Sequence, residues 1–156
     1  MAFAGSASVA TDVALTVDQL AVLRIQPLLK YRCLACHGDD REKIKGGYDM
    51  RTPSGLFAGG DSGEASIVGR KPGESPLFLS VNRAHADWEP MPPKETDGLK
   101  ANEIEWLRLW ISGGAPWPEG EERAAIQKQS DRLLAGDGMR VKTSKALNEE
   151  WAKRRY

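Results

Sequence analysis

The only two cysteines of the chain, Cys33 and Cys36, stand three positions apart, and His37 follows directly. This spacing is close to one helical turn, so both sulfur atoms can reach the two vinyl groups along one edge of a porphyrin. The imidazole of the next residue then comes under the iron. The sequence Cys33-Leu34-Ala35-Cys36-His37 is the pattern of covalent haem attachment, and it predicts one haem c per chain.

Other uses of a cysteine pair fit this chain less well. A zinc site needs four ligands, so it would have to use every Cys and His side chain of the chain: Cys33, Cys36, His37 and His85. A thioredoxin-like redox pair needs a strand–helix setting that the surrounding sequence lacks. A disulfide or a chance pair of thiols has no use for a histidine at the next position. Haem is therefore the preferred interpretation.

A second axial ligand for the iron is expected from Met91, which has prolines on both sides. Flanking prolines restrict the backbone, so a thioether can be held in place with little further loss of entropy. A methionine in the sixth position suits electron transfer and raises the reduction potential. The alternatives are His85, an open or water-ligated iron and, as weaker candidates, Met50 and Met139.

Further side chains are candidates for contacts with the haem. Its propionates accept hydrogen bonds from charged or N–H donors, which Arg51, Arg70, Arg83 and Trp88 offer; the alternative for each of them is solvation at the surface. Trp106 and Trp110 lie on a later amphipathic segment, where they would either cover a haem edge or pack in the core. The glycine-rich run 59–63 lacks the spacing of a phosphate-binding loop and a preceding strand, so nucleotide binding is rejected.

The fold is expected to be mainly α, with long Gly/Pro-rich loops. Breakers are dense between Gly38 and Pro93, and an irregular stretch of that length typically wraps something. Apolar periodicity predicts helices elsewhere, and Pro27 must kink the first or open a second one. The expected helices run from Thr16 to the cysteine pair and over residues 74–82, 100–112, 121–135 and 144–154.

Three parts of the chain are distinguished. Residues 1–15 are interpreted as the remnant of an export signal or a disordered N-terminus, 16–119 as the haem-binding domain and 120–156 as a helical tail. Residues 1–119 carry 13 basic and 16 acidic side chains, whereas 120–156 carry 9 basic and 6 acidic ones. The tail is thus either a solvated helix or a segment that docks on an acidic surface.

Charge argues against one class of partner, and hydropathy argues against a membrane span. The net charge of the whole chain is zero, which argues against a nucleic-acid binder that neutralises phosphates. No apolar run approaches the length that a membrane span requires. The partners expected for a haem domain of this kind are instead other redox proteins.

Several motifs together resemble the planctomycete-type cytochrome c domain, a relative of the class I cytochromes c. The ordered set covers about residues 19–118 and comprises Cys33–Gly38, Lys45–Gly47, Gly59–Gly63, Met91–Pro93 and Glu103–Pro118. The resemblance implies a cytochrome c-like helical haem pocket with His37 proximal and Met91 distal. It also implies maturation outside the cytoplasm, in the periplasm or an equivalent compartment.

Two departures from related proteins matter. No Gly-Pro pair follows His37, so the carbonyl that accepts a hydrogen bond from the imidazole N–H of His37 is unassigned. A helix-opening Ser or Thr is replaced by Lys100, which weakens that cap.

The functional hypothesis is a mono-haem electron carrier outside the cytoplasm, not an enzyme. Electron transfer requires no general acid or base, and no carboxylate pair or nucleophile constellation is visible in the sequence. The alternative is a haem enzyme or ligand sensor with an exchangeable sixth position, for which His85 would be the distal acid or base. A third hypothesis is an accessory module with a structural haem.

Overall fold

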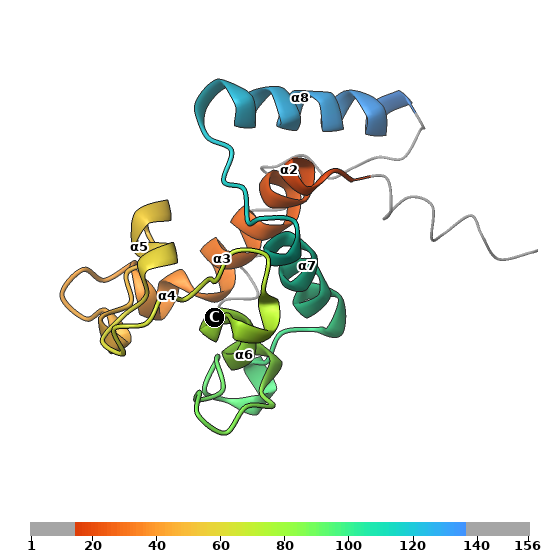
Figure 1. Ribbon diagram of the computed structural model, residues 1–156. Helices are drawn as coiled ribbons and strands as arrows, with labels where there is room; N and C mark the ends of the chain where they lie inside the picture. The colour runs from red at the N-terminus through yellow and green to blue at the C-terminus, as the bar shows by residue number, and fades with distance from the viewer. Residues whose placement is uncertain (1–14, 137–156) are drawn as a thin grey trace, which may run out of the picture.

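The computed structural model describes residues 15–136 (Figure 1). The described residues form helices and loops with no strand, which confirms the mainly α, cytochrome c-like fold. The predictions for the first 14 residues, for Met139 and for a helix over 144–154 lie outside the described residues.

The first predicted helix is present as three consecutive pieces. They are α2 (Val17–Leu20), a wider π-helical turn η1 (Ala21–Ile25) and α3 (Gln26–Arg32). Thr16 caps α2 as expected: its hydroxyl accepts from the N–H of Gln19 at 3.1 Å, and the Gln19 side chain accepts from the N–H of Thr16 at 2.9 Å. This reciprocal pair satisfies N–H groups that a helix start leaves free.

Pro27 explains the change of helix geometry. It has no N–H for the carbonyl of Leu23, four residues earlier, which instead accepts from the Arg24 guanidinium at 3.5 Å. The wide turn η1 precedes it, and Pro27 lies in the first turn of α3. The expectation that this proline opens a second helix is therefore confirmed.

The glycine- and proline-rich middle of the chain contains one helix that the sequence analysis missed. After α4 (Leu34–His37) and the short turn η2 (Lys45–Gly47) comes α5 (Pro53–Ala58). The Thr52 hydroxyl accepts from the N–H of Gly55 at 3.1 Å, and Pro53 occupies the first helical position. A capping threonine followed by proline is a start signal that could have predicted this helix.

The helix predicted over 74–82 begins two residues later than expected. A single turn η3 (Pro72–Glu74) comes first, and α6 spans Pro76–Asn82. Ser75 between them is extended (φ −93°, ψ 111°), because a following proline disfavours the helical conformation. The prediction of a helix start at Glu74 was therefore wrong, and its end at Asn82 is confirmed.

The last two described helices follow their predictions closely. After the short turn η4 (Glu95–Asp97), α7 spans Ala101–Ser112 and α8 spans Gly120–Gly136. The N–H of Lys100 donates to the Glu103 carboxylate at 2.9 Å, so a helix without a Ser or Thr cap still has one N–H satisfied at its start.

The core lies where α7 packs against α2, η1 and α6, while α8 lies beyond α2 at the end of the molecule away from α6 (Figure 1). Trp110 is fully buried there, and its indole N–H donates to the carbonyl of Pro116 at 2.8 Å. Of the two expected roles, Trp110 therefore has the core role. The other largest fully buried side chains are Ile25, Leu28, Leu56, Leu107, Ile111, Val22, Val81 and Ser75.

Candidate functional site

A cavity of about 690 Å³ opens between α4, α6 and the loops around them, a volume in the range of cofactor pockets. One wall carries Cys33, Cys36 and His37, and Met91 also lines the cavity. The structure thus brings together all four predicted haem-binding residues, although they come from two segments more than fifty positions apart. Apolar and aromatic side chains complete the walls: Tyr48, Met50, Pro76, Leu77, Val81, Trp88, Pro92 and Pro93.

His37 ends α4 and is oriented by two backbone carbonyls. Its Nδ1 lies 3.1 Å from the carbonyl oxygen of Lys45 and 3.2 Å from that of Tyr48. A carbonyl only accepts, so Nδ1 carries the proton and Nε2 keeps the lone pair that a metal needs. These carbonyls supply the acceptor that the sequence left unassigned.

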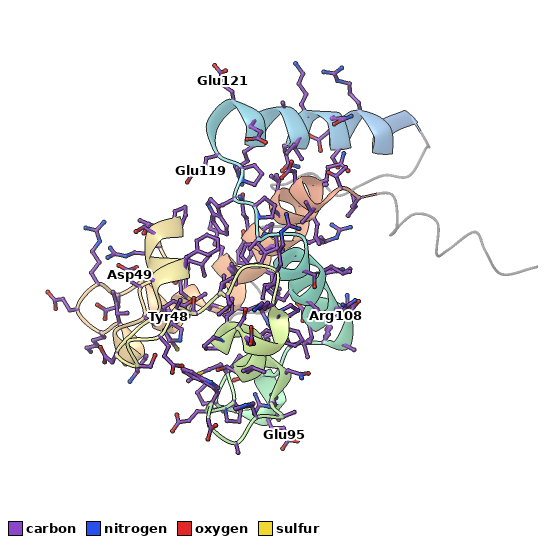
Figure 2. The ribbon with its side chains drawn as sticks, in the orientation of Figure 1. Tyr48, Asp49, Glu95, Arg108, Glu119 and Glu121 are labelled. Carbon is purple, nitrogen blue, oxygen red and sulfur yellow. The ribbon has the colours of Figure 1, made fainter. Side chains whose placement is uncertain are left out.

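The protonation state of His37 suits a metal ligand. Burial lowers its pKa, and the hydrogen bonds to the carbonyls of Tyr48 and Lys45 act in the opposite direction. A lowered pKa favours the neutral imidazole at pH 7, which is the form that binds a metal. The Tyr48 ring packs beside the imidazole, with ring centroids 5.4 Å apart. Tyr48 lies on the connection between α4 and α5 (Figure 2).

Tyr48 is itself held rigidly. Its hydroxyl lies 2.7 Å from the carbonyl oxygen of Leu56 and 2.8 Å from Oγ of Ser66. Burial raises the pKa of Tyr48 above its ordinary value. The tyrosine thereby ties the loop that orients His37 to α5, and the sequence analysis did not single it out.

The two cysteines are free thiols with different surroundings. Cys36 is exposed, whereas Cys33 is half-buried. Burial raises the pKa of the Cys33 thiol to about 12, and the neighbouring Arg32 guanidinium acts against that rise. Both thiols line the cavity, where they can meet one edge of a flat ligand.

Met91 lies on the loop that follows α6. Its N–H donates to the carbonyl of Ser80 at 3.0 Å, which fixes the backbone of this residue against α6. Met50 also lines the cavity, and its N–H donates to the carbonyl of His37 at 2.8 Å. His85, in contrast, is exposed and does not line the cavity; its Nδ1 accepts from the N–H of Asp87 at 3.2 Å.

The candidates for propionate contacts separate into two groups. Trp88 lines the cavity, as a propionate donor must. The three arginines do not: Arg51 pairs with Asp49 at 2.6 Å, Arg83 donates to a backbone carbonyl, and Arg70 is exposed elsewhere. Of the four candidates, only Trp88 therefore lines the cavity.

Arg32 is the cavity-lining arginine that the sequence analysis missed. Its Nε is buried without a hydrogen-bond partner, a feature that no other described side-chain N or O atom shares. A buried N–H without an acceptor is costly and indicates a group that the protein chain itself does not supply. The signal in the sequence was its place directly before Cys33.

The donor set in the cavity fits a haem. It offers a neutral imidazole, a thioether, two thiols on one wall, apolar sides and an unpaired N–H. Within residues 15–136, no group of three or more His, Cys, Asp or Glu side chains could hold a metal ion, so the zinc alternative has no ligand set there.

The helical fold, with Cys-x-x-Cys-His lining its cavity, is consistent with a cytochrome c-like fold. A family model described as Planctomycete cytochrome C matches residues 33–95, which confirms the resemblance over that segment. The match is narrower than the 19–118 expected from the motifs, yet it includes the cysteine pair, His37 and Met91. The match covers less than half of the chain, so it shows a similarity to this cytochrome family over that segment.

Neither the curated proteins nor the solved structures that were searched gave a match to this chain. Across the described residues 15–136, none of the helices combines the length and apolarity needed to cross a membrane.

Proposed function

We propose that the protein is a mono-haem c-type cytochrome that carries single electrons between redox proteins outside the cytoplasm. The observation that carries this proposal is the shared cavity of the Cys33–His37 segment and Met91. Two cysteines suffice for one attachment site, so one haem per chain is expected.

The roles of the residues follow from their chemistry. Cys33 and Cys36 would hold the porphyrin through thioether bonds, while His37 Nε2 and the Met91 sulfur would hold the iron. The bound haem supplies one-electron oxidation and reduction. The carbonyls of Lys45 and Tyr48 hold the proton on Nδ1, which makes the imidazole a stronger donor and favours ferric iron. The apolar walls exclude water.

Two observations favour a carrier over the haem-enzyme alternative. His85, the histidine that the alternative needs as a distal acid or base, is exposed outside the cavity. Met91 lines the cavity, and its backbone is hydrogen-bonded to α6, so its thioether is available as the second axial ligand of the iron. A filled sixth position leaves no place for a substrate on the iron.

Charge around the cavity supports a partner with a basic surface. Four exposed carboxylates line it, against two basic side chains, Arg32 and Lys45. Opposite charges steer encounters between proteins and raise association rates. The carboxylates belong to Asp61, Glu64, Asp87 and Glu89.

The test uses haem-loaded protein produced with an export signal. Replacement of both cysteines (Cys33→Ala with Cys36→Ala) should leave no porphyrin on the chain after denaturing electrophoresis. Met91→Ala should abolish the weak long-wavelength charge-transfer band of Met-ligated ferric iron and lower the reduction potential. Met50→Leu is the matched control, because it removes the other methionine of the cavity at nearly constant volume.

The outcomes separate the hypotheses. High-spin bands and immediate cyanide uptake in the unaltered protein would favour the enzyme or sensor. Loss of the charge-transfer band in Met50→Leu but not in Met91→Ala would move the axial ligand to Met50. A correctly matured sample without iron would refute the proposal altogether.

A further inference from the structure

The loop that carries Met91 is fastened at both ends; we call residues 91–98 the methionine segment. At its beginning, the Met91 N–H donates to the carbonyl of Ser80 at 3.0 Å, and Arg83 Nη1 donates to the carbonyl of Pro92 at 2.5 Å. Both bonds come from the last turn of α6 or the residue that ends it. The backbone on either side of the Met91 side chain is therefore tied to one helix end.

Arg83 combines a left-handed backbone with a hydrogen-bonded side chain. It ends α6 with φ 61° and ψ 22°, in the left-handed region that arginine rarely adopts. Such a conformation persists where surrounding contacts hold it, and it points to a role for the side chain so placed. Here the half-buried side chain reaches the Pro92 carbonyl and also approaches Gly98, the last residue of the methionine segment.

A second arginine holds the far end of the segment. Nη2 of Arg32 donates to the carbonyls of Asp97 and Gly98, both at 3.0 Å, and lies 3.9 Å from the Glu103 carboxylate. Arg32 directly precedes Cys33 in the chain. It therefore connects the Cys-x-x-Cys-His motif with the loop that carries Met91.

We propose that Arg83 and Arg32 are positioning residues that keep the Met91 thioether at the iron against competing ligands. The inference rests on the proposed function. A thioether is a neutral, weak ligand, and its advantage over an external ligand is the high local concentration that a fixed loop provides. Hydrogen bonds from charged donors are stronger than neutral ones, so two arginines can hold a loop that contains little regular structure.

The test measures displacement of Met91 in the haem-loaded protein. The rate of cyanide binding to ferric iron and the pH at which the charge-transfer band disappears are compared for the unaltered protein, Arg83→Ala and Arg83→Lys. In Arg83→Ala, cyanide binding should become about tenfold faster and the band should be lost at a less extreme pH. Arg83→Lys keeps one charged donor and should recover part of the difference.

Arg108→Ala is the matched control, because Arg108 is an exposed arginine of α7 that pairs with Glu105 away from the cavity. Its cyanide rate should stay within about twofold of the unaltered protein, as expected for a surface pair. Arg32→Gln weakens the hydrogen bonds to the carbonyls of Asp97 and Gly98 and should accelerate cyanide binding, as Arg83→Ala does.

The results distinguish this inference from the proposed function. A Met-ligated spectrum in the unaltered protein with unchanged cyanide rates in Arg83→Ala, Arg83→Lys and Arg32→Gln would overturn the positioning role and leave the carrier intact. If Arg83→Ala does not fold, Arg83→Lys and Arg32→Gln decide the matter. An unaltered protein without a thioether ligand would overturn both proposals.

Discussion

The Nδ1 atom of His37 lies 3.1 Å from the carbonyl oxygen of Lys45, on a loop that closes back on the Cys-x-x-Cys-His turn. This contact determines which ring nitrogen carries the proton and which one is left for a metal. The Lys45–Tyr48 loop is packed closely, since a Cβ at Gly60 would collide with the carbonyl of Gly46 and touch Tyr48. The orientation of His37 therefore depends on a glycine 23 positions away in the chain.

Gly60→Ala should loosen this arrangement. The added methyl group pushes on the backbone of the Lys45–Tyr48 loop, at a cost of about 1–3 kcal/mol in unfolding free energy. Weaker hydrogen bonds at Nδ1 make the imidazole a poorer donor, so the reduction potential should rise by on the order of 40 mV for about 1 kcal/mol lost. Potentiometric titration of the haem-loaded protein measures the shift.

Gly73→Ala is the control for that substitution, because a Cβ at Gly73 meets nothing within 4 Å. It should leave both the potential and the stability nearly unchanged. A potential that is equal in the two variants would show that the carbonyl contacts do not tune the iron.

The chemistry-bearing residues could be predicted because their signals are local. The cysteine spacing, the adjacent histidine and the prolines beside Met91 each occupy a few consecutive positions, and the structure gathers them at one cavity. The helices with clear apolar periodicity, such as α7, were predicted to within one residue for the same reason.

The partners of the supporting residues could not be predicted, because they lie far away in the sequence. Arg32 reaches carbonyls 65 and 66 positions later, and neither contact leaves a trace in the sequence around Arg32. Arg51 and Arg83 were candidates for the haem propionates on charge alone, and in the fold they bind loop groups. Charge indicates what a side chain can bind, and only the fold determines which partner is within reach.

The core offers a matched pair of leucines on α7. Leu107 is fully buried, whereas Leu109 is 45% exposed. Leu107→Ala should lower the unfolding free energy by about 2–5 kcal/mol, because it removes buried methyl groups and leaves a cavity. Leu109→Ala should change it by less than about 0.5 kcal/mol. Urea titrations followed by helical circular dichroism provide both values, and equal losses would contradict the packing of α7.

Tyr48→Phe should reveal the buried phenol through the pH dependence of stability. Near neutral pH the variant should be less stable by about 1 kcal/mol, since it loses the contacts with Leu56 and Ser66. Burial raises the pKa of Tyr48 in the folded state above that of the unfolded chain, which is about 10. The unfolded state therefore releases its proton first, and the unaltered protein loses stability as the pH rises above 10.

The phenylalanine variant lacks that titrating group, so its unfolding free energy should not fall with pH on this account. The difference between the two proteins should shrink above pH 10 by up to about 1.4 kcal/mol per pH unit. Urea unfolding at several pH values between 7 and 11 measures it. A difference that is constant over this range would mean that Tyr48 titrates alike in the folded and unfolded states.

The acidic residues around the cavity should make electron exchange depend on the charge of the reaction partner. At low ionic strength, a cationic metal complex should oxidise the reduced protein faster than an anionic complex of similar driving force. The advantage should fall with added salt, because screening weakens attraction between exposed charges. Stopped-flow measurements with both complexes over a range of salt concentrations provide the comparison.

Charge reversal at the cavity tests whether the acidic residues there cause the dependence of the rate on the charge of the metal complex. Glu64→Lys with Asp87→Lys should reduce the low-salt rate with the cationic complex by about tenfold, the lower end of what steering supplies. The control is Glu121→Lys with Glu122→Lys, which makes the same change in net charge on α8, at the end of the molecule away from α6 (Figure 2). Because screening confines the field of exposed charges to about 10 Å at 0.1 M salt, the control should approach the unaltered rate as salt is added to that level. Equal losses in the two double variants at 0.1 M salt would mean that electrons do not leave the protein near the acidic residues that line the cavity.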